Sequence, residues 1–500
     1  MRRRRFLKSS ATAAAVAALP QVSLAASLRH VPTKVPGAVE AITADRQSVT
    51  LPSAVVQEFS DTLKSHLLLP GVDGYDSARQ LLNPSFDKRP ALIAQPTGAA
   101  DVQTAVRFAR DHNLLLAVKC GGHSASGKSS CNQGLQIDLS KFHGVRVDTQ
   151  AKTARVDGGS LLGELDHESM AHGLVTTAGT VSHTGVGGLT LGGGFGRLGR
   201  RFGMTIDNVL EMDVVTPDGS LRRAAPDENP DLYWALRGGG GNFGVVTSFL
   251  FALHPMQRQV ITGRFNYPLS EVKQVLRFYG EYGENAPDEL DMFASVFSRP
   301  GGAPASVTMG FVWSGDPAKL DSITTALGKA GSVIKETINP IDYVALQRSG
   351  DSTDPRANGT YQKSGFIGSI TDAMVDDMVD HFDPKPDRAT WIAFQQTGGA
   401  IGRVANDATA FPHRESQFNM LAFMAWKYGA DSIQHVKDIK AYWSHMEPYT
   451  RGFYSNDVFD QTQQSVNANF RENFARLLAV KNRYDPSNLF RLNTNISTPG

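Results

Sequence analysis

The chain has 500 residues, of which 41% are hydrophobic and 20% are charged, and its formal net charge is +1. This length exceeds what one hydrophobic core usually supports, so we expect two or more lobes with room to enclose a large ligand. The ordinary composition excludes global disorder, and a total of two cysteines excludes a disulfide framework.

Residues 1–25 predict a signal peptide: an arginine cluster, a short Ala-rich run and the small-residue sequence Ser23-Leu24-Ala25. The apolar run is too short to span a membrane. Arg3-Arg4-Arg5-Phe6-Leu7-Lys8 is close to the twin-arginine pattern, with Arg2 where Ser or Thr is usual. This pattern favours export of the folded protein to the periplasm or medium, and an ordinary secretory signal is the alternative. Cleavage would lower the formal charge from +1 to −4, so nothing electrostatic favours nucleic acid or anionic membrane as a partner.

Residues 26–85 predict a lead-in segment with one helical piece, 51–69. A first domain is expected over 86–257. In it, RPALIAQP predicts a strand, AADVQTAVRFARDHN a helix with Val102, Ala105 and Val106 at helical spacing, and LLLAVKC a buried strand that ends in glycine. This order predicts a βαβ unit, and the Gly121-Gly122 turn lies where such a unit presents its loop to a ligand.

Further along, NVLEMDVVTPDGSLRRA predicts a hairpin around Pro217-Asp218-Gly219. Glycine density drops at about 253–257, where we expect a domain boundary. Residues 258–450 alternate strand-like and helical stretches, which predicts a substrate domain with an antiparallel sheet covered by helices. Residues 451–500 return to compact, turn-rich sequence. The fold class is therefore α+β.

Two glycine-dense loops stand out, KCGGHSASG (119–127) and GTVSHTGVGGLTLGGGFGRLG (179–199). Glycine permits positive φ and lets backbone N–H groups approach a phosphate, so two such loops suit a pyrophosphate; tight turns in a β-rich domain are the alternative. The fragments 194–199 and 239–244 match G-x-G-x-x-G but lack the strand-before-helix order of a Rossmann domain. Neither fragment ends like a phosphate-binding P-loop.

These loops, with LQIDLS, LRGGGGNFGVV and a terminal YDPSNLFRLNTNI, closely resemble the berberine bridge enzyme-like FAD-linked oxidases of the vanillyl-alcohol-oxidase (PCMH-type) flavoprotein superfamily. The match runs in order from about Pro90 to Ile496 and is weaker across 258–450. It implies a PCMH-type FAD-binding domain over 86–257, and a C-terminal segment, 451–500, that returns to it.

In that family the histidine of the GGH motif attacks a methyl group of the isoalloxazine ring, and the match carries this role to His123. Imidazole suits the role as a good neutral nucleophile near pH 7. Doubly linked members carry a cysteine where this chain has Val181, so FAD is expected to be linked once. Thr184 occupies a position associated with oxygen access, which leaves oxygen and another electron acceptor both open. The resemblance also implies that FAD is contacted by Gly121, Gly122, Ser124, Gly127, Thr184, Gly187, Gly188, Gly192, Gly194, Val246 and Asn493.

The family takes a base from the substrate lobe, and GFYSNDVFD resembles its Tyr-x-Asn stretch, which makes Tyr454 the candidate base. A buried ring with a satisfied hydroxyl is the alternative. His413 in FPHRE is a second catalytic candidate, against a purely structural histidine. His143, His167, His172 and His183 lack metal-ligand spacing, so no metal site is predicted. Cys120 and Cys131 are interpreted as free thiols, with one bridge between them as the alternative.

The leading hypothesis is an exported FAD-linked oxidoreductase that removes hydride from an alcohol, sugar or related hydroxylated small molecule. Oxidative C–N or C–C chemistry on an alkaloid or antibiotic-like molecule is a second hypothesis. A flavin-holding sensor or carrier without turnover is a third, from another class of protein.

Overall fold

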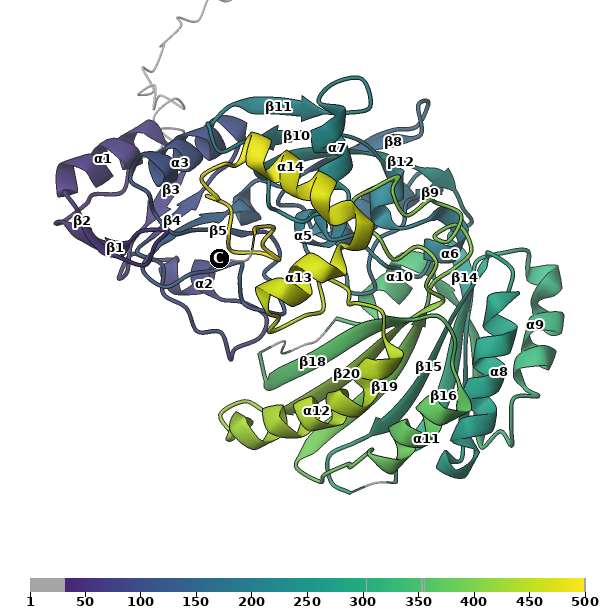
Figure 1. Ribbon diagram of the computed structural model, residues 1–500. Coiled ribbons are helices and arrows are strands. Elements are labelled where there is room, and N and C mark those ends of the chain that lie inside the picture. Colours follow the sequence, from purple (N-terminus) through teal and green to yellow (C-terminus); the bar gives the residue numbers. More distant parts are fainter. Residues whose placement is uncertain (1–31, 303, 352–353, 355, 499–500) are drawn as a thin grey trace, which may run out of the picture.

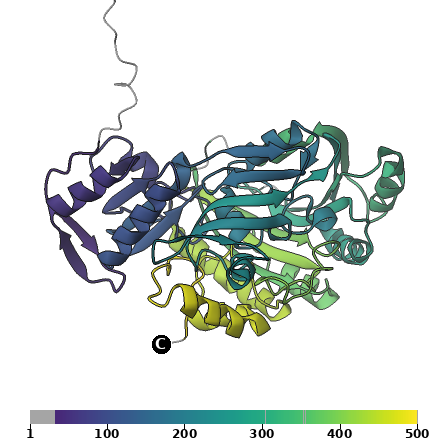
Figure 2. The same ribbon diagram turned by 90° about the horizontal axis from the view of Figure 1, so that it is seen from above.

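A computed structural model describes residues 32–302, 304–351, 354 and 356–498 and shows a two-lobed molecule (Figure 1). The predicted signal peptide, 1–25, lies outside the described residues. The molecule is elongated, with α1 (Ser53–Thr62) and α3 (Ala99–Asp111) at one end and α9 (Leu320–Leu327) at the other (Figure 2). None of the helices in these ranges is long and apolar enough to cross a membrane.

The four-stranded sheet of the first lobe confirms the predicted βαβ unit. Its order is β3-β4-β6-β5, with β3 at His66–Leu68, β4 at Leu92–Gln95, β5 at Leu116–Lys119 and β6 at Leu135–Asp138. α3 connects β4 to β5, and both strands run parallel to β6, which lies between them. Val102, Ala105 and Val106 of α3 are buried, as their spacing predicts. β5 ends at Lys119, so the chain passes directly from the sheet into the first glycine loop.

The prediction of a separate lead-in segment over 26–85 is wrong for its described part. That part contains β1 (Val39–Ile42), β2 (Ser48–Leu51), α1, β3 and α2 (Tyr75–Arg79). β3 pairs with β4, and Phe59 of α1 stacks on Phe108 of α3 with ring centroids 4.0 Å apart. The first lobe therefore begins before residue 86, because α1 and β3 share one hydrophobic core with α3 and β4. The predicted helical piece, 51–69, is divided between α1 and β3.

A five-stranded antiparallel sheet completes the first lobe. Its order is β11-β10-β12-β8-β7, with β7 at Val145–Asp148, β8 at Thr153–Asp157, β10 at Val209–Val215, β11 at Leu221–Ala224 and β12 at Val245–Ala252. β10 and β11 form the predicted hairpin. Helix α7 (Pro230–Leu236) precedes the fragment 239–244 and β12 follows it. This order confirms that the fragment is not a Rossmann motif.

Short elements lie between the strands of this sheet and directly after its last strand. They are α4 (Leu162–Met170), α5 (Val186–Leu191), α6 (Gly199–Phe202) and the strand pair β9 (Leu174–Val175) and β13 (His254–Pro255). The second glycine loop surrounds α5.

The second lobe is a seven-stranded sheet in which every pairing is antiparallel, in the order β17-β14-β16-β15-β19-β20-β18. The bounds are β14 Gln259–Tyr267, β15 Leu290–Ser298, β16 Ser306–Trp313, β17 Lys335–Asp342, β18 Asn358–Ile367, β19 Arg388–Gln396 and β20 Phe418–Lys427. Helices α8 (Val272–Glu284), α9, α11 (Asp372–Asp380) and α12 (Ser432–Met446) cover one face and share one hydrophobic core with it (Figure 1). The predicted helix-covered antiparallel sheet is thus confirmed, and its uncovered face is left for other contacts. α10 (Tyr343–Arg348) packs against α4 of the first lobe.

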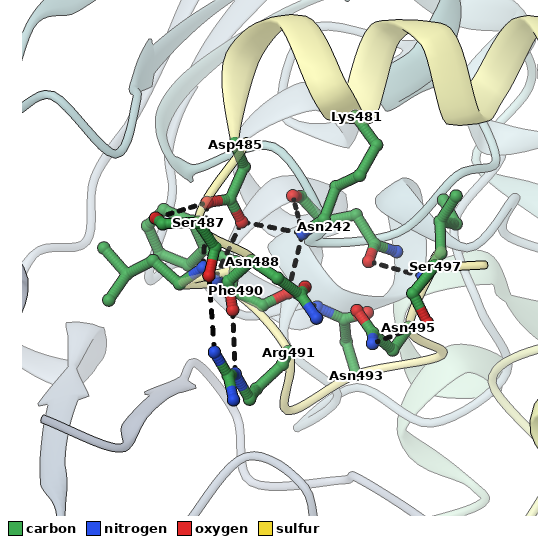
Figure 3. A network of polar contacts seen from close by, with 12 residues as sticks. Asn242, Lys481, Asp485, Ser487, Asn488, Phe490, Arg491, Asn493, Asn495 and Ser497 are labelled. Atoms are coloured by element: carbon green, nitrogen blue, oxygen red, sulfur yellow. Dashed lines mark hydrogen bonds and ion pairs between the residues drawn. The ribbon is translucent and has the colours of Figure 1, made fainter. Parts of the chain in front are cut away.

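After residue 450 the chain returns to the first lobe through α13 (Gln463–Asn469) and α14 (Phe474–Tyr484), and α14 packs against α7. Figure 3 shows the polar network that holds the turn after α14. Lys481 Nζ lies 2.7 Å from Asp485 Oδ2 and donates to the backbone oxygen of Asn242 at 2.8 Å. Asp485 also accepts hydrogen bonds from the backbone N–H groups of Leu489 and Phe490. This buried, fully bonded pair fixes the path of the residues that follow it, 490–496.

Candidate active site

A cavity of about 720 Å³ lies between the first lobe, the uncovered face of the seven-stranded sheet and the C-terminal segment. Both glycine loops contribute to its wall. The predicted flavin-contacting residues that line it are Gly121, Gly122, His123, Ser124, Thr184, Gly187, Gly188, Gly192, Val246 and Asn493. Gly127 and Gly194 do not line it. Instead, the Gly127 carbonyl accepts a hydrogen bond from Lys88 Nζ at 2.6 Å, and the Gly194 N–H points at a tyrosine hydroxyl of the wall.

The two glycine loops approach each other at Gly121 and Gly185. A Cβ atom added to Gly121 would lie 2.4 Å from the backbone nitrogen of Gly185 and 3.0 Å from the backbone oxygen of His183. Only glycine permits so close an approach of the two backbones. Gly122 next to it has φ +74°, which also favours glycine. The close approach places His123 beside the second loop.

His123 is hydrogen-bonded to His183, a contact that the sequence did not predict. His123 Nε2 lies 2.6 Å from His183 Nδ1, and the two ring centroids are 4.7 Å apart. The other ring nitrogen of His123, Nδ1, lies 3.4 Å from Thr184 Oγ1. Burial, and after it the neighbouring His183, lower the pKa of His123 to about 4. His123 is therefore neutral at pH 7, which is the form that can act as a nucleophile.

The cavity fits a dinucleotide. Asn493 Oδ1 and Ser129 Oγ are buried in its wall without a hydrogen-bond partner, so both are free to bind a ligand. The amide nitrogen of Asn493 is already held by the Phe490 carbonyl at 2.8 Å, and its backbone oxygen by Lys128 Nζ at 2.9 Å. The wall between the loops is glycine-rich backbone, which suits a pyrophosphate. Within the described part of the chain, no group of three or more His, Cys, Asp or Glu side chains is placed to hold a metal ion.

Tyr454 lines the same cavity, as the sequence comparison of its motif implied. Its hydroxyl oxygen accepts hydrogen bonds from the backbone N–H of Gly194 at 2.9 Å and from Asn456 Nδ2 at 2.8 Å. Burial and the nearby Asp457 raise the pKa of Tyr454, and these two hydrogen bonds oppose that rise. The two donors would stabilise negative charge on the oxygen, but burial outweighs them, so the phenol keeps its proton at neutral pH.

The structure does not bring His413 to the cavity, so its prediction as a catalytic candidate is corrected. Its side chain is buried, and Nε2 lies 3.0 Å from the backbone oxygen of Asn469 and 3.1 Å from Asn469 Oδ1. Its ring stacks on Phe366 with centroids 4.6 Å apart. Burial lowers the pKa of His413 to about 4. His413 is therefore a neutral structural residue that joins two segments of the chain.

Cys120 and Cys131 are both free thiols, as predicted. Cys120 lines the cavity, but burial raises the pKa of its thiol to about 11. The protonated thiol that results is a poor nucleophile.

Sequence reasoning missed the wall that the second lobe supplies. It consists of residues on the uncovered face of three strands, namely Asn358, Thr360, Gln362, Gln395, Leu421 and Phe423. Their spacing of two along β18 and β20 was a usable signal, because alternate residues of a strand share a face. Gln362 Nε2 donates to the backbone oxygen of Asp457 at 2.9 Å. This wall is rich in amide and hydroxyl groups.

Comparisons with known proteins agree with this geometry. Residues 90–225 match the family described as FAD binding domain, and residues 453–497 match the family described as berberine and berberine like. An FAD-linked oxidoreductase of Dictyostelium discoideum is 32% identical over 450 residues, which cover 88% of this chain and 96% of that protein. A chitooligosaccharide oxidase of Gibberella zeae is 28% identical over 430 residues, which cover 80% of this chain and 86% of that protein.

A solved structure supports the same assignment. The crystal structure of 6-hydroxy-D-nicotine oxidase from Arthrobacter nicotinovorans has a TM-score of 0.80 and 26% sequence identity to this chain, and covers 87% of this chain and 98% of its own. The two matched domains, the cavity and the 32% identical relative all indicate the same family. This chain belongs to the berberine bridge enzyme-like, PCMH-type flavoproteins and is an FAD-dependent oxidoreductase.

Proposed function

We propose that this oxidoreductase holds FAD covalently through His123 alone and oxidises an alcohol, sugar or related hydroxylated small molecule. Bound FAD would supply the hydride acceptor, and oxygen or another acceptor would reoxidise it. The observation that carries the proposal is that His123 and the doubly hydrogen-bonded hydroxyl of Tyr454 line one cavity.

At the cofactor end, His123 is neutral and has one ring nitrogen, Nδ1, outside its short hydrogen bond to His183. A second link is not expected. Val181 stands at the position where doubly linked members of the family carry cysteine, and the Cys120 thiol keeps its proton because burial raises its pKa to about 11. Both observations therefore agree with a single covalent bond between FAD and the protein, at His123.

At the substrate end, Tyr454 is the residue that would take the hydroxyl proton, and this role requires bound FAD and substrate to lower the pKa that burial raises. The N–H groups of Gly194 and Asn456 compensate the phenol oxygen as it gains negative charge. In the same cavity, the amides of Gln362 and Gln395 and the ring of Phe423 form a wall suited to a molecule with several hydroxyl groups. The side chain of Gln395 has no hydrogen-bond partner among the described residues, so its amide is free for substrate.

The names of the two relatives indicate two classes of substrate. One is a chitooligosaccharide oxidase and the other a 6-hydroxy-D-nicotine oxidase. The first name indicates a sugar with many hydroxyl groups, and the second indicates a hydroxylated amine. The hydroxyl-binding wall favours the first chemistry for this chain.

The test has two parts. Acid-precipitated wild-type protein should keep its yellow colour, and His123→Ala should lose it while the native protein still binds FAD. The flavin should then bleach anaerobically with sugars or alcohols, and readmitted oxygen should show whether oxygen is the acceptor. Bleaching by amines alone would replace the proposed substrate class, and no bleaching by any compound would favour a flavin-holding protein without turnover.

We further propose that the protein is exported by the twin-arginine route. The support is the sequence Arg3-Arg4-Arg5-Phe6-Leu7-Lys8 and the Ala-rich run after it. Export of a fused folded reporter should stop when Arg3 and Arg4 are both replaced by Lys. Export that continues would indicate an ordinary secretory signal.

A further inference from the structure

The wall of the cavity holds a chain of three polar side chains that ends on the flavin-linking histidine. His123 Nε2 is 2.6 Å from His183 Nδ1. On the far side of the same ring, His183 Nε2 is buried without a hydrogen bond, and Asp351 Oδ1 lies 4.0 Å from it. The three groups therefore stand in the order carboxylate, imidazole, imidazole.

Asp351 is held in place as a carboxylate. Its Oδ1 accepts a hydrogen bond from the backbone N–H of Ser182 at 2.9 Å, and its Oδ2 accepts one from the Ser182 hydroxyl at 2.5 Å. Burial opposes ionisation, but these hydrogen bonds and the nearby His183 bring the pKa of Asp351 below its ordinary value. A fixed negative charge thus faces the Nε2 edge of His183.

This charge favours one arrangement of the ring protons. A carboxylate near Nε2 of His183 favours the tautomer with its proton on Nε2, which leaves Nδ1 as a hydrogen-bond acceptor. The short contact then requires His123 to donate from its Nε2. The proton-free nitrogen of His123 is consequently Nδ1, the atom beside Thr184 Oγ1.

We propose that His183, oriented by Asp351, takes the Nε2 proton of His123 and so makes Nδ1 of His123 the atom that bonds to FAD. This inference rests on the proposed single linkage through His123. His183 and Asp351 are positioning residues in this scheme, because they act through His123.

The bond that forms joins His123 Nδ1 to the ring methyl carbon, and the bond that breaks is one methyl C–H, whose hydrogen leaves as a proton to water. The Nε2 proton of His123 passes to His183 Nδ1, which avoids a cationic His123 ring. The two electrons left behind reduce the flavin and pass on to oxygen or the acceptor used in turnover.

The test measures acid-stable flavin per protein chain, together with total bound flavin, in purified full-length variants incubated with FAD. His183→Asn keeps a group that can accept a hydrogen bond but cannot take the proton, so its linkage rate should fall by about 10², the scale of general-base catalysis. The linkage rate of Asp351→Asn should also fall, by a smaller factor. Total bound flavin should stay near the wild-type value in both variants.

His183→Ala leaves space for free imidazole, which should restore linkage to this variant and not to His123→Ala. His254→Asn is the matched control. His254 also makes a 2.6 Å hydrogen bond, to Asn208 Oδ1, but it does not line the cavity, so linkage should be unchanged. Should His183→Ala fail to fold, His183→Asn and Asp351→Asn decide the question alone.

The measurements distinguish failure of the single linkage from failure of the role of His183. If wild-type protein holds no acid-stable flavin, the single linkage itself is refuted. If wild-type flavin is acid-stable and His183→Asn links FAD as fast as the wild type, the linkage stands and the role of His183 is refuted.

Discussion

The hydroxyl oxygen of Tyr454 accepts two hydrogen bonds, from Gly194 N–H and Asn456 Nδ2. Tyr454→Phe removes this acceptor and leaves both donors without it. We expect the rate of anaerobic flavin reduction by substrate to fall about 10²–10⁴-fold, as for loss of a general base. The free energy of unfolding should fall by about 1–3 kcal/mol, because buried donors lose their partner. Stopped-flow absorbance and denaturant unfolding measure the two effects.

Tyr361→Phe is the matched control for this prediction. Tyr361 is also buried and its hydroxyl donates to Asp460, but it does not line the cavity. It should lose stability while flavin reduction stays at the wild-type rate. Equal slowing in both variants would assign Tyr454 a structural role only.

Among individual residues, the sequence located the first glycine loop but not its polar partners. His123 follows from a short local motif, whose spacing determines the backbone that carries it. Its contact with His183 joins positions 60 residues apart, and no spacing rule connects them. The error at His413 has a related cause, because FPHRE does not reveal whether the imidazole faces the cavity or, as found, Asn469.

At the scale of elements, the two glycine loops depend on one close backbone contact. Gly121→Ala would place a Cβ atom 2.4 Å from the backbone nitrogen of Gly185, which cannot move aside as a side chain could. We expect the free energy of unfolding to fall by about 1–3 kcal/mol, the usual cost of overpacking. Acid-stable flavin should fall as well, because separated loops no longer hold His123 against His183. Thermal unfolding and flavin-to-protein ratios measure both quantities.

Gly368→Ala provides the comparison. Gly368 is exposed and has no atom within 4 Å of an added Cβ, so its stability should change by less than about 0.5 kcal/mol. Equal losses in the two variants would show that the contact with Gly185 is not the cause.

Elements with a strong local pattern were predicted, and elements defined by distant pairing were not. The βαβ unit and the β10–β11 hairpin are short, contiguous and bounded by turn residues, so their periodicity is visible in the sequence. The order of the seven-stranded sheet is not local. β14, for example, pairs with both β16 and β17, and β18 pairs with β20 across an intervening strand and helix. The boundary predicted at residue 86 failed for the same reason. β3 belongs to the first lobe because it pairs with β4, which lies more than 20 residues further along the chain.

At the scale of the whole molecule, the two lobes meet around one buried carboxyl. Asp166 of α4 is 1% exposed, and Gln347 of α10 donates from Nε2 to its Oδ2 at 3.2 Å and to the Gly179 carbonyl at 2.7 Å. Burial raises the pKa of Asp166 to about 7, against the opposing hydrogen bond from Gln347 and the charge of Arg197. The folded carboxyl therefore keeps its proton up to about pH 7, whereas the unfolded one releases it near 3.8.

Between these two pH values the folded state binds more protons, so the contribution of Asp166 to stability falls as pH rises from about 4 to 7. The slope approaches about 1.4 kcal/mol per pH unit. Asp166→Asn removes the titration and keeps an acceptor for Gln347, so the variant should gain stability over the wild type at pH 8 and show no such gain at pH 4. Asp372→Asn is the control: this exposed carboxyl pairs with Arg277, which lowers its pKa, so its contribution to stability varies with pH only below about pH 4. The stability difference between this variant and the wild type should therefore stay constant over pH 4–8. Denaturant unfolding across pH 4–8 that gives the same slope for the wild type and Asp166→Asn would show that this carboxyl does not couple pH to the packing of the lobes.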